Sequence, residues 1–433
     1  MRKHILSLLG LITAGHIALG QANIYPAKPQ SKPMAVVGAT IHTGTGQVIQ
    51  NGYISFDKGK ITGIGDASSV KFNTATTEII NGAGKHIYPG FISPLTNLGL
   101  TEIESVRATL DFREVGNMNA HVRSVMAYNT DSKVPNTLRT NGILLAQVAP
   151  QGGTISGQSS LMELDGWNWE DAAYKTDVAL HLNWPAMQQS GGRFGPRLSP
   201  EQQRERYQRS VDEIRGFFTE AKAYYEAPKT EVFNARFAAV KRVFTGEEKV
   251  FVSANSAKDI IAAVTFFKGL DITPVLVGGR DAHLVTGLLK DNNISVIINE
   301  PHSLPGRTDD DVYLPYKQAK LLQDAGINYA LSIDGYWQQR NLPFMAGTAA
   351  AHGLTKEQAL SAITLNPAKI LGVDKTAGSL ETGKDATFFV SSGDALDMRT
   401  NDVEQAFIRG KNLDLDNLHK QLYKRYSQKY DLK

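Results

Sequence analysis

Three polar side chains, His181, His302 and Asp334, each follow an apolar run of the chain and could do chemistry together. Two imidazoles and a carboxylate form a ligand set that suits zinc or another divalent metal ion. A lone histidine is more often a hydrogen-bonded structural residue, so this metal site is the less favoured interpretation. Without a metal, Asp334 could act as a general base, or it could cap the helix that follows it.

A second group of residues could bind a substrate. The glycine-rich segment 152–158 follows the apolar run that ends at Val148, and its backbone N–H groups could cradle an anion. The predicted substrate-binding residues are Gly153, Ser156, Gln158, Asn97, Asn255 and His302. The segment 378–384 has the spacing of a phosphate loop, but Asp385 stands where a Ser or Thr must hold magnesium, so we expect a turn there. Neither G-x-S-x-G nor H-E-x-x-H occurs, which removes the usual signatures of serine hydrolases and zincins.

The elements that must position these residues alternate between apolar runs and amphipathic runs. Strands are predicted at 142–148, 249–252, 273–277, 295–298 and 329–333, and helices at 257–268, 282–291, 314–325 and 342–351. Alternating strands and helices predict an α/β fold with a parallel sheet, and residues 89–371 suit a closed (β/α)8 barrel. An open doubly wound sheet is the competing topology. In a barrel, catalytic groups lie where the strands end.

The two ends of the chain have a different texture, with short strand-like runs between glycine-rich turns. Neither end has enough apolar residues to fold alone. We therefore expect residues 34–88 and 372–412 to build one small composite β-sandwich domain, followed by a helical tail at 413–433. The charge-rich segment 199–229 is predicted to be a solvated helix inserted into the barrel.

Composition narrows the possible functions. The chain has 433 residues, of which 42% are hydrophobic and 21% charged, as expected for a globular protein. A net charge of +3 spread along the chain provides no basic surface for nucleic acid. The chain contains no cysteine, which excludes disulfides, thiolate zinc sites and cysteine nucleophiles.

The N-terminus predicts export. Arg2 and Lys3 precede an apolar run from Ile5 to Leu19, and small residues stand at Gly20 and Ala22, as at a signal-peptidase site. We expect residues 1–22 to be a signal peptide and residues 23–33 a loose leader. The mature protein would be periplasmic or secreted, with no membrane segment.

Four segments resemble the amidohydrolase superfamily in its imidazolonepropionase-like branch. The first, INGAGKHIYPGFI at 80–92, resembles the entry into the barrel of that family. The others, at 353–360, 362–372 and 378–386, resemble its C-terminal signature. The resemblance implies a metal-dependent-hydrolase barrel with a composite β-sandwich, acting on C–N bonds.

The same resemblance implies that the histidine metal ligands of the family are replaced by other residues in this chain. Leu95, Asn97, Ser253 and Gly278 stand at those positions, and only the eighth-strand aspartate is matched, by Asp334. A catalytic zinc takes about three protein ligands and a water. We therefore expect no cofactor, with zinc or another divalent metal only if His181 and His302 rebuild the site.

Three functions remain open from the sequence. The first is a hydrolase of C–N bonds in small cyclic amides or peptide-like substrates. The second is a catalytically inactive barrel that binds a small ligand or partners an active relative, or a second copy of itself. The third is a metal-free enzyme that uses Asp334 as general base.

Overall fold

The computed structural model describes residues 24–187, 198–227 and 232–432. The predicted signal peptide, 1–22, lies outside the described residues. The strands are β1 (Met34–His42), β2 (Val48–Asp57), β3 (Lys60–Asp66), β4 (Glu78–Asn81), β5 (His86–Pro89), β6 (Phe91–Thr96), β7 (Ile143–Val148), β8 (Ile155–Glu163), β9 (Ala173–Asn183), β10 (Lys249–Ala254), β11 (Val275–Gly278), β12 (Val296–Asn299), β13 (Tyr329–Ser332), β14 (Phe388–Ser391), β15 (Val403–Ile408) and β16 (Lys411–Asn412). The α-helices are α2 (Lys133–Arg139), α3 (Trp169–Ala172), α4 (Pro200–Glu226), α5 (Ala235–Phe244), α6 (Ala257–Lys268), α7 (Thr286–Asp291), α8 (Leu314–Asp324), α9 (Leu342–Ala351), α10 (Lys356–Ser361), α11 (Leu365–Leu371) and α12 (Leu418–Lys429).

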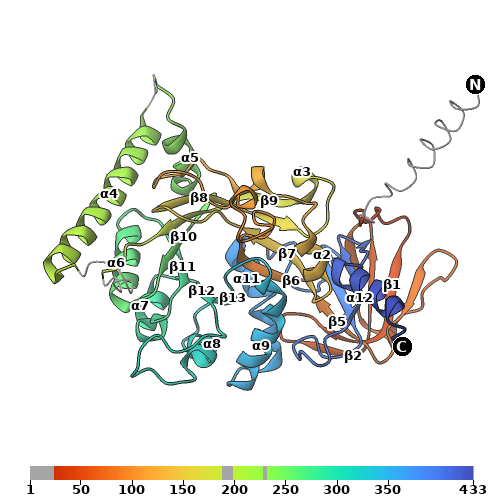
Figure 1. The fold of residues 1–433 in the computed structure, drawn as a ribbon. Helices are drawn as coiled ribbons and strands as arrows, with labels where there is room; N and C mark the ends of the chain where they lie inside the picture. Colours follow the sequence, from red (N-terminus) through yellow and green to blue (C-terminus); the bar gives the residue numbers. More distant parts are fainter. Residues whose placement is uncertain (1–23, 188–197, 228–231, 433) are drawn as a thin grey trace, which may run out of the picture.

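Strands β6 to β13 form one eight-stranded sheet in chain order, which curls into a nearly closed barrel (Figure 1). Apolar side chains from these strands fill its interior, among them Ile92, Leu145, Phe251, Ile297 and Ala330. The two edges, β13 and β6, make no direct ladder. Between them runs the segment after α10, where Ala362 accepts from the Leu331 N–H (3.0 Å) and Ile363 accepts from the Ile92 N–H (2.8 Å). The predicted α/β barrel is therefore present, and the open sheet is wrong.

One strand departs from the expected parallel order. Strand β8 is antiparallel to both of its neighbours, β7 and β9. A short loop and not a helix joins β7 to β8, and only the single turn α3 separates β8 from β9. The segment 152–158, predicted as a glycine-rich loop, is thus half loop and half strand, since β8 begins at Ile155. The reversal places the start of β8 at the same rim as the end of β9.

Both chain ends contribute to a second eight-stranded sheet, in the order β16-β15-β14-β5-β1-β2-β3, with β4 paired to β1. Strands from the two ends meet where β5 pairs with β14. In Figure 1 the red N-terminal and blue C-terminal parts lie together there. Buried rings of Phe56, Phe388 and Phe407 form the centre of its core. We call this the composite sheet; the two-layer sandwich remains a prediction.

The remaining segments cover the barrel or extend from it. Helix α4, in the segment predicted to be a solvated helix, projects from the barrel beside α5 (Figure 1). One side of this helix buries Ile214 and Phe218. The leader 24–33 has no helix or strand but is tied down, because Ala27 N–H donates to Asp165 and the Gln30 amide donates to the Phe56 carbonyl. In the described part of the chain, no helix has the length and apolar character needed to span a membrane.

Candidate functional site

The carboxyl ends of four neighbouring parallel strands meet at one rim of the barrel, which we call the mouth. Their register sets these ends level, because Ala254 of β10 pairs with Gly278 of β11, and Asn299 of β12 pairs with Ser332 of β13. Side chains just beyond strand ends in such a barrel face a common space. The rim residues are Asn255, Gly278, Asn299, Glu300 and Asp334.

Two carboxylates lie at this rim. Asn299 donates from Nδ2 to Oδ1 of Asp334 at 2.6 Å, which orients the carboxylate, and Asn299 Oδ1 is buried with no partner among the described residues. Glu300 has a positive φ of 54°, a conformation unusual for a side-chain-bearing residue, and its N–H donates to the Ser332 carbonyl. Partial burial and the nearby Asp334 carboxylate raise the pKa of Glu300. The pair can therefore offer one carboxylate and one group that holds its proton more tightly.

The rim residues line a cavity of about 270 Å³. Gly278 must be glycine here, since its φ is +85° and a Cβ would lie 2.6 Å from Asn255 Oδ1. Arg280 lines the opposite wall together with the 303–306 loop that follows β12. The cavity thus combines amides, three carboxylates (Glu300, Asp310 and Asp334) and one guanidinium with a few apolar contacts, a composition suited to a small polar ligand.

Comparison with known proteins supports one family. The model of the Amidohydrolase family matches residues 317–413. An imidazolonepropionase from Fusobacterium nucleatum is 24% identical over 367 residues, which cover 79% of this chain and 86% of that protein. The solved structure of an amidohydrolase from Thermotoga maritima superposes with a TM-score of 0.75 at 20% identity, covering 88% of this chain and 99% of that one. The motif resemblance, the family model and the fold agree.

Residues 317–413 match the Amidohydrolase family, and the chain is similar in sequence and in fold to proteins of the amidohydrolase superfamily. The comparisons support the coarse assignment of an amidohydrolase-family hydrolase. They also agree with the barrel, although β8 runs against its neighbours.

Amidohydrolase-superfamily proteins usually hold a metal at the mouth, but the residues of this chain do not fit one. Leu95 offers only an alkyl side chain there, and the Asn97 amide is buried and donates to Thr101 Oγ1 at 3.0 Å. Gly278 has no side chain, and the space beside it holds Asn255 Oδ1. Within 24–187, 198–227 and 232–432, no three His, Cys, Asp or Glu side chains are grouped closely enough to hold a metal ion. Three deprotonated donors are what a catalytic zinc requires.

The structure does not bring the alternative metal set together. His181 lies on β9 inside the barrel against Phe251, its Nε2 has no partner among the described residues, and burial lowers its pKa to about 3. His302 turns away from the mouth cavity and shares a 2.6 Å hydrogen bond with Thr348 Oγ1 of α9. Asp334 lines the mouth cavity, and neither His181 nor His302 is among the residues that line it.

The predicted substrate-binding residues separate into groups. Asn255 lies at the mouth cavity with Asp334, as expected from the strand ends. Gly153 and Ser156 lie together on the β8 side of the mouth, where Asn183 Nδ2 donates to the Gly153 carbonyl (2.9 Å) and to Ser156 Oγ (3.2 Å). Gln158 points outward instead and donates to the Ala239 carbonyl of α5. The expected binding loop therefore does not gather its residues at one place.

The sequence-based prediction of site residues did not include two residues that line this cavity. Asn299 and Glu300 directly follow the apolar run 296–298, so the strand-end rule applied to Asn255 would also have indicated them. Their relation to Asp334 had no sequence signal, because a contact between residues 35 positions apart depends on the β12–β13 register.

Proposed function

We propose that this chain hydrolyses a C–N bond of a small cyclic amide or acyl-amino acid at the mouth cavity, without a metal. The observation that carries the proposal is the rim pair of Asp334 and Glu300, held by Asn299 in a cavity of suitable size. The amidohydrolase fold supports hydrolysis as the reaction class, and the donor set at the mouth argues for acid–base chemistry in place of zinc.

In this mechanism each carboxyl group has one role. Asp334 takes a proton from a water molecule as that water attacks the substrate carbonyl. Glu300, whose pKa is raised, gives its proton to the leaving nitrogen as the C–N bond breaks. Asn299 holds Oδ1 of Asp334, which leaves Oδ2 free for the water.

A second candidate is a barrel that binds the same kind of ligand without turnover. The observation that favours it is the occupation of the four imidazole positions by Leu95, Asn97, Ser253 and Gly278. Loss of those imidazoles removes the means by which relatives would activate water.

One experiment separates the two candidates. Purified chain is assayed for ligand binding and for hydrolysis of cyclic imides and acyl-amino acids, with and without a chelator, and its metal content is measured. We expect turnover that survives the chelator, far less than one equivalent of metal, and a loss of about 100-fold or more in Asp334→Asn and Glu300→Gln with binding kept. Asp309→Asn, an exposed carboxylate outside the cavity lining, is the control.

Other results have defined meanings. Binding with no turnover in the wild-type chain supports the second candidate. Turnover that depends on added zinc would refute the metal-free mechanism.

A further inference from the structure

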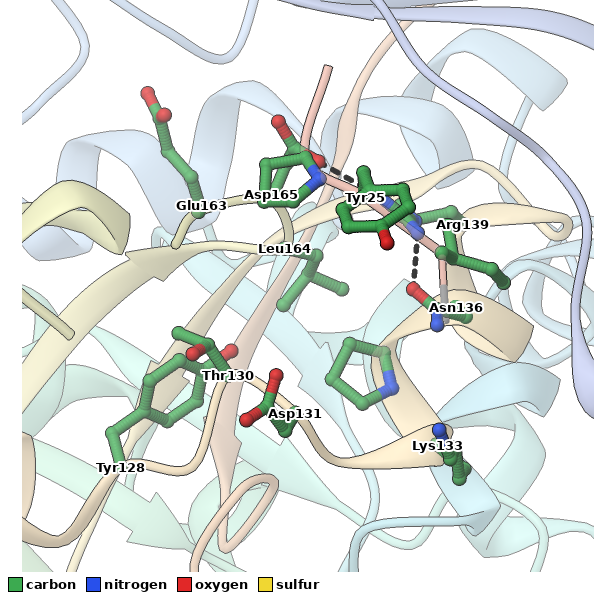
Figure 2. A pocket seen from close by; sticks show the side chains of 14 residues that line it. Tyr25, Tyr128, Thr130, Asp131, Lys133, Asn136, Arg139, Glu163, Leu164 and Asp165 are labelled. Carbon is green, nitrogen blue, oxygen red and sulfur yellow. Dashed lines mark hydrogen bonds and ion pairs between the residues drawn. The ribbon is translucent and has the colours of Figure 1, made fainter. Parts of the chain in front are cut away.

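A second cavity, of about 160 Å³, lies beside α2 and the end of β8. Its walls come from the leader, the loop before α2, α2 itself and the end of the reversed strand β8 (Figure 2). It shares no lining residue with the mouth cavity. A protein cavity of about 150 Å³ is large enough to take a benzene-sized molecule. We call it the lower cavity.

One deeply buried polar side chain in its wall is incompletely satisfied. Arg139 is 3% exposed; its guanidinium donates to Asp165 at 3.0 Å and to Asn136, while its Nε has no partner in the described part of the chain. Buried polar groups in folded proteins almost always have a partner, either protein or bound molecule.

The lower cavity also carries two opposite charges without ion pairs among the described residues. The Asp131 carboxylate lies beneath Leu164 in Figure 2, and Lys133 stands at the start of α2. The carboxylate can hold an ammonium group and the ammonium can hold a carboxylate. A ligand with a single charge would leave one of the two unmatched.

Part of the remaining wall is apolar, although Thr130, Asn136 and Glu163 also line the cavity. Leu164 is buried near the centre of the view in Figure 2, with the Tyr25 ring above it, and Pro135 also lines the cavity. Such a surface fits an aliphatic group. The size, the paired opposite charges and the apolar wall together define the ligand.

We infer that the lower cavity binds a free α-amino acid with an aliphatic side chain, its ammonium group on Asp131 and its carboxylate on Lys133. The site is separate from the mouth, so it does not depend on the proposed hydrolysis.

Isothermal titration of the full chain with L-leucine tests this site. We expect saturable binding with one site per chain, and little binding of 3-methylbutylamine or 4-methylpentanoate, which each lack one charge. Asp131→Asn and Lys133→Gln should each weaken leucine binding about tenfold or more. The matched exposed controls, Glu205→Gln and Lys258→Gln, should bind as wild type does.

The mouth variants make the result decisive. Leucine binding that is unchanged in Asp334→Asn supports the lower cavity, and binding that is lost there but kept in Asp131→Asn overturns it. No heat of binding at about 10 mM leucine would overturn the proposal, as would equally tight binding of either singly charged analogue.

Discussion

At the scale of single residues, the mouth depends on groups that constrain one another. Asn299 fixes the orientation of Asp334 by a 2.6 Å hydrogen bond, while partial burial and the Asp334 carboxylate raise the pKa of Glu300. Gly278 is needed for a different reason, since any side chain would collide with Asn255. Removing the amide of Asn299 would therefore disturb Asp334 without touching a carboxylate.

The buried imidazole of His181 predicts an acid-sensitive fold. Its pKa is lowered from 6.5 to about 3 by burial, so between these values the unfolded chain binds a proton that the folded chain does not. The contribution of His181 to the free energy of unfolding is therefore fully present above pH 6.5, and it is lost as the pH drops toward 3. Urea unfolding at pH 7 and pH 5 measures this effect. Between these pH values the free energy of unfolding should fall by about 2 kcal/mol more in wild type than in His181→Gln.

The exposed His121 provides the matched control, because His121→Gln should lose stability with pH as wild type does. Equal pH dependence of wild type and His181→Gln would mean that His181 is not buried as a neutral group.

At the scale of elements, the loop between β12 and α8 closes one wall of the mouth. Arg307 holds this loop to the barrel by two hydrogen bonds to the Asp281 carboxylate, at 3.0 and 3.1 Å, and a third to Asp310. The Asp281 side chain is 3% exposed, so the loop is fastened to a buried anchor. A bidentate pair of this kind fixes orientation as well as distance.

Loss of this contact should loosen the loop. In Arg307→Ala we expect faster hydrogen–deuterium exchange of the amides in 301–312 and a lower melting temperature, because the buried Asp281 carboxylate loses its two hydrogen bonds from the guanidinium. Arg399→Ala, which removes another exposed arginine paired with aspartate, should leave exchange in 301–312 unchanged. Unaltered exchange in Arg307→Ala would show that other contacts hold the loop.

At the scale of the whole molecule, the composite sheet makes the two chain ends interdependent. Strand β5 is flanked by β1 from its own end and by β14 from the other. The side chains of Phe388, Phe389 and Phe407 are fully buried, and each contributes about 2–3 kcal/mol by burial. The free energy of unfolding of a domain is only about 5–15 kcal/mol. We therefore expect the composite sheet to unfold when the C-terminal strands are removed.

A chain that ends at Leu371 should therefore be insoluble or strongly destabilised, since it exposes the edge of β5 and the apolar face beneath it. A chain that ends at Asn417 loses only α12, which has no buried residue, and should stay soluble with a similar melting temperature. Solubility and thermal melting of both test this. Normal melting of the shorter chain would mean that the N-terminal strands are stable alone.

Features that depend on local apolar periodicity and on motif identity could be predicted from the amino-acid sequence. The helices at 257–268 and 342–351 match α6 and α9 in both bounds, because Ser256 caps the start of α6 and a proline stands in the first turn of α9. The motifs around residues 80–92 and 353–386 pointed to the amidohydrolase superfamily. The export signal at 1–22 stays a prediction.

The contacts between distant segments depend on strand pairing and packing, and only the three-dimensional structure reveals them. The apolar content of 155–163 is compatible with either strand direction, so the reversal of β8, and with it the lower cavity, had to come from pairing with β7 and β9. His302 follows an apolar run as Asp334 does, but its side chain lies against α9, where it forms a hydrogen bond with Thr348. Asn299 reaches Asp334 because β12 and β13 are in register. These contacts join residues far apart in the chain, and local sequence carries no information about which of them will form.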